Sequence, residues 1–382
     1  MRLKLPFPPI PLVLLASLAA CGDSAPTAPE DGISLDAVGV AAKRGPAPAS
    51  SAGTSVVMSN LDSPRGLAFG PEGALYVAEA GTTVVRGACA TVFRGQNCYS
   101  GTGAVSRLWK GRQERLVSGL PSFYNPATLD IGGPQDISFQ GRGNGYVTIG
   151  WGAAPAARAG LGELGALFGT LIRVGPNGRW RVDTDIAGFE AAQNPDGLNF
   201  DSNPYGLLAE PGRQFVTDAG GNSLVEVAAN GTISLVAVFP RIPAPPPFMQ
   251  SEAVPTEVVR GPDGALYVST LRGVPFAAGS AAIYRVVPGA APELYAGGFK
   301  TITDFDWGPD GSLYVLQYAS APVFFGGPGS LIRVAPGAGG ARTTIVATLT
   351  NPTGVLVAPD GAIYVSNRGN VAGVGEVLRI VP

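Results

Sequence analysis

Three acidic residues occupy matching places in a segment that this chain repeats. Asp136, Glu257 and Asp304 each begin an apolar stretch that runs into a turn, and Asp306 follows two residues after Asp304. Carboxylates that lie close together raise one another's pKa unless they share a cation, and Ca²⁺ takes such oxygen ligands. The chain contains no histidine, which excludes Ser-His-Asp and Cys-His nucleophiles and histidine-bound transition metals. Any catalysis would rely on carboxylate, tyrosine, arginine or calcium chemistry.

The repeated segment has the pattern of a β-hairpin. Each copy reads as an apolar strand, a turn and a second apolar strand, and the clearest turns have the sequence Gly-Pro-Asp-Gly. Proline presets φ at the first central turn position, and glycine supplies the residue with positive φ. Repetition of this kind indicates stacked supersecondary units. The six copies begin at Gly66, Asp136, Gly206, Glu257, Asp304 and Gly354.

A third strand, usually with an arginine, follows each hairpin, and a fourth strand usually follows that. Four short antiparallel strands repeated radially make a β-propeller. We therefore predict an all-β fold, a six-bladed β-propeller of four-stranded antiparallel blades over residues 54–382. The sixth repeat ends after its third strand, and a strand-like run at 54–61 precedes the first repeat. We expect this N-terminal strand to complete the sixth blade and close the ring.

The first 20 residues have the features of an export signal. A basic start precedes an apolar stretch, which ends in Ala19-Ala20-Cys21. This is typical of a bacterial lipoprotein signal peptide, and an ordinary secretory peptide is the alternative. We predict a lipid on Cys21, a flexible tether over residues 21–53 and an extracytoplasmic protein anchored to the cell envelope. The formal net charge of −2 gives no attraction for nucleic acid.

The two remaining cysteines, Cys89 and Cys98, lie in one insertion. A lone close pair in an exported chain is expected to form a disulfide, which would pin an otherwise irregular excursion. Two free thiols or a metal pair are the alternatives, although no histidine is present to complete a zinc site.

The long connections all fall on one side of the predicted ring. In a propeller, connections between second and third strands and between blades share one face, here called the long-loop face. Because function concentrates in loops held by a rigid scaffold, this is the predicted working face. Aromatic candidates for ligand contact there, or alternatively for packing within the loops, are Tyr124, Trp151, Tyr205 and Phe276.

The same face carries the start of each innermost strand, so Asp136, Glu257 and Asp304 should surround the mouth of the central channel. Asp306 shares their side of the strand, deeper in the channel. These carboxylates could hold Ca²⁺, or they could cap backbone N–H groups of a neighbouring blade or bind channel water.

One further polar run, residues 194–203, alternates oxygen-bearing side chains but lacks the closing glutamate of a calcium loop, so turn chemistry is expected. Asp185 is expected to cap a short helix over residues 186–193.

Several segments resemble the ScyD/ScyE family of secreted bacterial proteins, in the order expected for residues 54–382. The most specific is residues 201–208, Asp-Ser-Asn-Pro-Tyr-Gly-Leu-Leu. The others are residues 133–137, 185–190, 194–197 and 254–256 and the two-cysteine insertion. The resemblance implies an NHL-like six-bladed ring and export, and it brings no catalytic residues.

We therefore predict a lipid-anchored, monomeric propeller that binds a ligand or an extracytoplasmic protein through the long-loop face. The alternative is a Ca²⁺-dependent hydrolase or lactonase-like enzyme that uses Asp136, Glu257 and Asp304.

Overall fold

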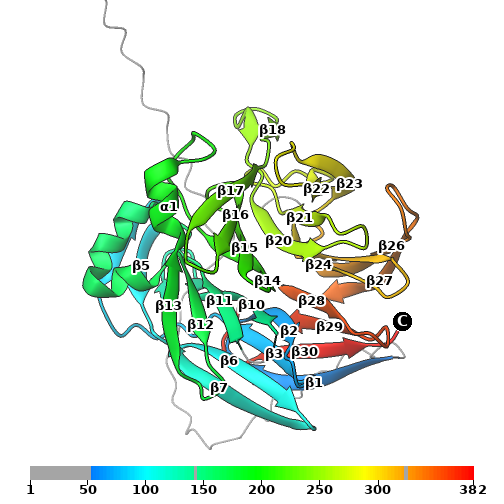
Figure 1. Ribbon diagram of the computed structural model, residues 1–382, viewed down its shortest axis with the longest axis horizontal. Coiled ribbons are helices and arrows are strands. Elements are labelled where there is room, and N and C mark those ends of the chain that lie inside the picture. Colours follow the sequence, from blue (N-terminus) through cyan, green and yellow to red (C-terminus); the bar gives the residue numbers. More distant parts are fainter. Residues whose placement is uncertain (1–52, 142–143, 322–325) are drawn as a thin grey trace, which may run out of the picture. The chain divides into compact units, whose positions relative to one another are not determined.

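The computed structural model describes residues 53–141, 144–321 and 326–382. The predicted signal peptide, Cys21 and nearly all of the predicted tether lie outside the described residues. Within those residues, six four-stranded antiparallel sheets follow one another along the chain (Figure 1). The fold class predicted from the repeats is confirmed. No helix in this part of the chain is long and apolar enough to cross a membrane.

The first strand of each sheet contacts the first strands of the sheets before and after it. The first three sheets are β2 (Pro64–Phe69), β3 (Leu75–Glu79), β6 (Gly103–Trp109), β7 (Arg112–Leu120); β10 (Pro134–Gln140), β11 (Asn144–Ile149), β12 (Thr170–Val174), β13 (Trp180–Asp185); and β14 (Pro204–Glu210), β15 (Arg213–Asp218), β16 (Ser223–Ala228), β17 (Ile233–Val238). The other three are β20 (Pro255–Arg260), β21 (Leu266–Thr270), β22 (Ala281–Val286), β23 (Glu293–Phe299); β24 (Ile302–Trp307), β25 (Leu313–Gln317), β26 (Gly329–Val334), β27 (Arg342–Leu349); and β28 (Gly354–Val357), β29 (Ile363–Asn367), β30 (Gly375–Ile380), β1 (Thr54–Leu61).

The N-terminal strand completes the sixth sheet, as the sequence predicted. β1 pairs antiparallel with β30, with Thr54 opposite Ile380 and Leu61 opposite Gly375 (Figure 1). The sixth sheet also reaches the first, because the Thr353 hydroxyl donates to the Pro64 carbonyl oxygen at 2.7 Å. The two ends of the repeat array are therefore tied together by backbone pairing and by a side-chain hydrogen bond.

The repeated hairpins form because turn chemistry and apolar alternation agree. Gly264 has φ of 78°, and the turn is closed by hydrogen bonds from the Gly264 N–H to the Gly261 carbonyl and from the Gly261 N–H to the Ala265 carbonyl, both 2.9 Å. The second strand of every hairpin then places a valine between neighbouring sheets. All six of these valines are fully buried: Val77, Val147, Val216, Val268, Val315 and Val365.

A seventh four-stranded sheet, here called the accessory sheet, lies outside the six. It consists of β4 (Cys89–Val92), β5 (Gly95–Tyr99), β8 (Phe123–Asn125) and β9 (Asp130–Gly132). Its strands come from two separate connections along the chain. β4 and β5 lie between β3 and β6, β8 and β9 lie between β7 and β10, and the two pairs join through β5 and β8. The expectation of an irregular excursion was therefore wrong.

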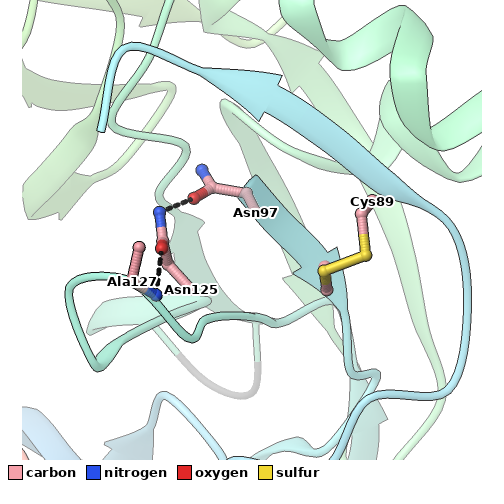
Figure 2. Close-up of a disulfide and its surroundings, with 5 residues drawn as sticks. Cys89, Asn97, Asn125 and Ala127 are labelled. Atoms are coloured by element: carbon pink, nitrogen blue, oxygen red, sulfur yellow. Dashed lines mark hydrogen bonds between the residues drawn. A yellow bond between two sulfur atoms is a disulfide. The ribbon is translucent and has the colours of Figure 1, made fainter. Parts of the chain in front are cut away.

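The accessory sheet is held together covalently and by amide side chains. The predicted disulfide between Cys89 and Cys98 is present and links β4 to β5 (Figure 2). The Asn125 amide donates to the Asn97 side-chain oxygen, and the Ala127 N–H donates to the Asn125 side-chain oxygen, both at 3.0 Å (Figure 2). The first bond joins the β4–β5 hairpin to β8, and the second closes the turn that follows β8.

Helical segments and a short hairpin lie in the connections β11–β12, β13–β14 and β17–β20. They are η1 (Pro155–Leu167), α1 (Ile186–Gln193), and the pair β18 (Ile242–Pro243) and β19 (Gln250–Ser251). The cap predicted for α1 is confirmed, since the Gly188 N–H donates to the Asp185 carboxylate at 2.9 Å.

Completion of the sixth sheet by β1 predicts unequal effects of two substitutions in that strand. Met58 is 1% exposed and packs in a core cluster with Leu67 and Val77, so Met58→Ala should lower the free energy of unfolding by about 2–5 kcal/mol. Val56 is 54% exposed, so Val56→Ala should change it by about 0.5 kcal/mol or less. Chemical denaturation of both variants provides the measurement. Equal losses at the two positions would contradict the observed pairing of β1.

Candidate functional site

The predicted carboxylates come together where the innermost strands begin. Asp136 on β10, Glu257 on β20 and Asp304 on β24 are all buried. The Glu257 carboxyl lies within electrostatic range of the other two, and Asp304 lies within range of Asp306. The expectation that these side chains share one region of the molecule therefore agrees with the structure.

The carboxylate oxygens of Asp136 and Asp304 bind backbone N–H groups of the next sheet. Asp136 Oδ2 accepts from the Leu207 N–H at 2.8 Å, and Asp304 Oδ2 accepts from the Val355 N–H at 2.7 Å. In both residues the other oxygen accepts from the N–H of the following residue, at 2.7 Å and 2.6 Å. Both carboxylates thus act as bridges between sheets.

A second pair of bridges between neighbouring sheets lies two residues further along β10 and β24. Asp306 Oδ2 accepts from the Val357 N–H at 2.8 Å, and the Ser138 hydroxyl accepts from the Ala209 N–H at 3.0 Å. Of the three interpretations left open by the sequence, the contacts of Asp136, Asp304 and Asp306 are those of capping a neighbouring blade.

Threonines form a second kind of bridge between neighbouring sheets. Each lies immediately before the aligned carboxylate or glycine, and its hydroxyl donates to a backbone carbonyl of the next sheet. The three bonds are Thr256 Oγ1 to Ile302 O (3.0 Å), Thr303 Oγ1 to Pro352 O (3.2 Å) and Thr353 Oγ1 to Pro64 O (2.7 Å).

In the first three sheets the same position carries a larger polar side chain, Arg65, Gln135 or Tyr205. The Arg65 guanidinium donates to the Ile131 carbonyl of the accessory sheet at 3.0 Å, to the Gln135 side chain at 3.3 Å and to the Gly369 carbonyl. It therefore ties the first sheet to three neighbouring segments. We did not identify Arg65 or Gln135 from the sequence, although aligning the residue before each aligned carboxylate or glycine would have revealed them.

Tyr205 is the predicted aromatic residue that lies beside the carboxylates. Burial raises the pKa of the Tyr205 hydroxyl, the charges of Asp304 and Glu257 raise it further, and Arg65 opposes them. The hydroxyl is therefore neutral at physiological pH and can act as a hydrogen-bond donor at the channel mouth.

Glu257 differs from the two aspartates because only one of its oxygens has a backbone partner. Glu257 Oε1 accepts from the Val258 N–H at 2.8 Å, and the carboxyl also interacts with Asp136 through a hydrogen bond. Burial raises the pKa of Asp136 to about 8, and burial together with the charges of Asp136 and Asp304 raises the pKa of Glu257 well above its usual range. Because Asp136 already accepts two N–H bonds, we assign the shared proton to Glu257.

Glycines at the aligned positions allow the innermost strands to approach one another. A Cβ on Gly66 would lie 1.8 Å from Asp136 Oδ1, and a Cβ on Gly206 would lie 2.3 Å from the Thr256 carbonyl oxygen. Within the described residues, no three side chains among the acids and cysteines form a group that could hold a metal ion.

The other aromatic candidates have different environments. Trp151 is fully buried, donates from Nε1 to the Ala154 carbonyl at 3.0 Å and packs against Phe168, so its environment fits packing within the loops, one of the two roles left open by the sequence. It is buried because η1 and the accessory sheet share its core cluster. Tyr124, on β8, and Phe276, in the connection between β21 and β22, are half-buried and belong to separate segments.

Most of the exposed large apolar side chains of the described residues lie in connections between second and third strands or between sheets, which are the connections of the predicted long-loop face. Phe93, in the turn between β4 and β5, is 97% exposed, and Phe248 and Met249 lie in the turn between β18 and β19. We call the whole set the apolar tips: Val84, Val85, Phe93, Leu129, Phe200, Phe248, Met249, Val274, Val371 and Val374.

One pocket, of about 310 Å³, lies on the opposite face, beside the turns of the first two sheets. Tyr76, Phe139 and Pro176 line it, and Glu72 accepts hydrogen bonds there from the Tyr76 hydroxyl and from Arg107. Nothing in the sequence indicated this pocket, which forms where two sheets diverge. Its charged groups are already paired with each other.

Comparison with known proteins supports the fold and nothing finer. No family model and no curated protein matches the chain. Two solved structures of glucose dehydrogenase are each 14% identical, with TM-scores of 0.53 and 0.50, over 86% of this chain and 99% of theirs. Virginiamycin B lyase from Staphylococcus aureus is 13% identical, with a TM-score of 0.48, over 86% and 99%. These neighbours are β-propeller proteins, and the likeness to the two glucose dehydrogenase structures supports the propeller fold alone.

The proton shared by Asp136 and Glu257 predicts a specific pH dependence. A carboxyl whose pKa is raised by folding keeps its proton where the unfolded chain releases it, so stability falls as pH rises from about 4 to about 8. A glutamine in place of Glu257 would keep the hydrogen bonds of the protonated acid without titrating. Glu257→Gln should therefore match the wild type at pH 4 and exceed its unfolding free energy at pH 8 by at least about 1.4 kcal/mol, the equivalent of one pKa unit.

Denaturant titrations at the two pH values measure this difference, with the exposed-turn variant Asp360→Asn as the control. A Glu257→Gln variant whose stability falls as steeply with pH as that of the wild type would show that the two carboxyls do not share a proton.

Proposed function

We propose that this propeller is a non-enzymatic scaffold that binds a protein partner through its long-loop face. The observation that carries the proposal is the concentration of the apolar tips on that face. Large exposed apolar side chains that gather on one side of a folded domain are typical of an interaction surface, whereas single ones scattered over the molecule are ordinary.

The tips are also held in a way that favours binding. Phe93 lies on a hairpin closed by the Cys89–Cys98 disulfide, and this hairpin pairs with β8. A rigidly displayed aromatic side chain loses little conformational entropy on association, so more of its burial contributes to affinity. Phe248 and Met249 are presented by a second hairpin on the same face.

The contacts of the channel carboxylates favour binding over hydrolysis. A general base needs a carboxylate oxygen available to a reacting proton, but Asp136 and Asp304 use both oxygens to accept backbone N–H groups. Arg65 is likewise committed to backbone carbonyls and to Gln135. The alternative of a Ca²⁺-dependent hydrolase or lactonase has no specific contact in its favour.

We further propose the cellular location and the family membership that the sequence suggested. The resemblance of residues 201–208 and the other quoted segments supports membership of the ScyD/ScyE family. The Cys89–Cys98 disulfide is consistent with an oxidising, extracytoplasmic compartment, in keeping with lipidation at Cys21. The partner would then be another protein of the cell envelope, met by a monomeric ring.

Site-specific photo-crosslinking in the native host tests the proposed surface. A photoreactive phenylalanine analogue at position 93 or 249 of the full-length protein should give discrete adducts of higher mass. The same analogue at Leu294, which is 65% exposed on β23, is the matched control and should give none. Adducts at 294 but not at 93 and 249 would contradict the proposal. Adducts to lipid alone would show that the apolar tips meet a membrane instead.

A further inference from the structure

A second acidic group lies away from the channel carboxylates, where α1 and the segment that follows it meet the end of β15. Glu190 of α1 and Asp218 of β15 are each 1% exposed. Their carboxyl groups flank the same backbone position. A Cβ built on Gly221 would lie 2.7 Å from Glu190 Oε2 and 3.3 Å from the Asp218 carboxyl carbon.

The two carboxylates differ in their hydrogen bonds. Asp218 is fully engaged, since its oxygens accept from the N–H groups of Asn203 at 2.6 Å and Gly221 at 3.1 Å and from the Ser202 hydroxyl at 2.7 Å. Glu190 Oε1, in contrast, is buried and has no hydrogen-bond partner. A buried carboxylate oxygen without a donor is costly, so a native protein is expected to compensate it.

Two more buried oxygens in the same stretch of chain lack partners, Asn194 Oδ1 and Asp201 Oδ1. Asn194 ends α1, and its amide nitrogen donates to the Leu198 carbonyl at 3.0 Å, so its amide orientation is already set. The unpartnered atoms of Glu190, Asn194 and Asp201 are all oxygen acceptors. A hard cation is a species that can satisfy several such acceptors at once.

The local charge points the same way. Burial, followed by the charges of Asp218, Asp196 and Asp201, raises the pKa of Glu190 to about 8. Burial, followed by the charges of Asp218 and Glu252, also raises the pKa of Asp201 to about 6, although the nearby Arg94 opposes this shift. Negative charge is thus concentrated around a buried carboxylate, and either a proton or a cation would relieve it.

We propose that the segment from Glu190 to Asp201 binds one Ca²⁺ ion. Glu190 and Asp201 would supply the charged ligands and Asn194 an amide oxygen, with backbone carbonyls and water completing the 6–8 oxygens that Ca²⁺ takes. Two carboxylates, an amide oxygen and backbone carbonyls are enough for such a ligand set. Asp218 organises the backbone around the site.

This proposal revises the interpretation of residues 194–203 and is independent of the proposed partner. In the sequence, no glutamate follows that run at the place where one closes a calcium loop. In the structure the glutamate precedes the run, on α1, which ends at Asn194 with φ of 41°, and the Glu190 carboxyl lies within electrostatic range of Asp196 and Asp201. Phe200, one of the apolar tips, is next to Asp201. Bound Ca²⁺ would therefore fix the backbone beside it.

Calorimetric titration of the chelator-treated full-length protein with CaCl₂ is the direct test, and thermal melting in Ca²⁺, Mg²⁺ or EDTA is the second measurement. We expect one Ca²⁺ per chain and a higher Tm in Ca²⁺ than in EDTA or Mg²⁺. Glu190→Gln and Asp201→Asn should each weaken binding at least tenfold. Asp360→Asn, which removes an exposed acid in a distant turn, should bind as the wild type does.

Three results would contradict the proposed site. The first is that Ca²⁺ gives no heat of binding and no shift in Tm. The second is that both Glu190→Gln and Asp201→Asn still bind Ca²⁺ as the wild type does, and the third is that Asp360→Asn loses binding to the same extent as they do. Glu190→Gln keeps the shape of the protonated acid, so this variant should fold. If the wild type binds no Ca²⁺ and Glu190→Gln is more stable than the wild type, Glu190 is a buried acid that holds a proton, and the proposed site is wrong.

Discussion

The innermost strand of each sheet presents an unpaired edge to the centre of the molecule, and satisfying that edge is the constraint on which the rest of the structure depends. Buried backbone N–H and C=O groups must find partners, and no further strand is available at the axis. Asp136 and Asp304 accept from N–H groups of the next sheet, and Thr303 and Thr353 donate to its carbonyls. The side chains that could do chemistry are therefore those that hold neighbouring sheets together.

This constraint explains why the centre looks reactive in sequence and is structural in its contacts. Two buried aspartates accept two hydrogen bonds each, whereas Glu257, one methylene longer, has a single backbone partner and interacts with Asp136. Arg65 extends the same bonding outward to the accessory sheet. With the centre committed in this way, variation is left to the connections, and it is there that the apolar tips and the proposed Ca²⁺ site are found.

The repeats carried enough information to predict the six sheets and the role of β1, because each copy combines a local turn signal with a buried valine such as Val77 or Val315. Asp185 indicated α1 for the same reason, since capping is a local interaction. The accessory sheet was not predictable in this way. Its strands β5 and β8 are separated in sequence by β6 and β7, so their pairing depends on the tertiary fold and not on a local turn. That pairing also buried Trp151, which sequence alone placed among loop aromatics.

The sequence predicted which residues form the candidate site, but not which hydrogen bonds they make. Repeat alignment located Asp136, Glu257 and Asp304, yet it could not show which oxygen meets which N–H, because that depends on how far neighbouring strands approach over Gly66 and Gly206. In the loop beyond α1, the residue that completes the acidic group, Glu190, lies before the polar run, on α1. A pattern that looks only forward along the chain misses it.

Amide hydrogen exchange of the native protein, resolved residue by residue, tests most directly whether side-chain bridges seal the inner edges. The N–H groups of Leu207, Val355 and Val357 belong to edge strands, yet they should exchange as slowly as those of central strands, only on global unfolding. Exchange of these three amides at the rate of the exposed turn amides would show that the inner edges are open, and would contradict this account of the fold.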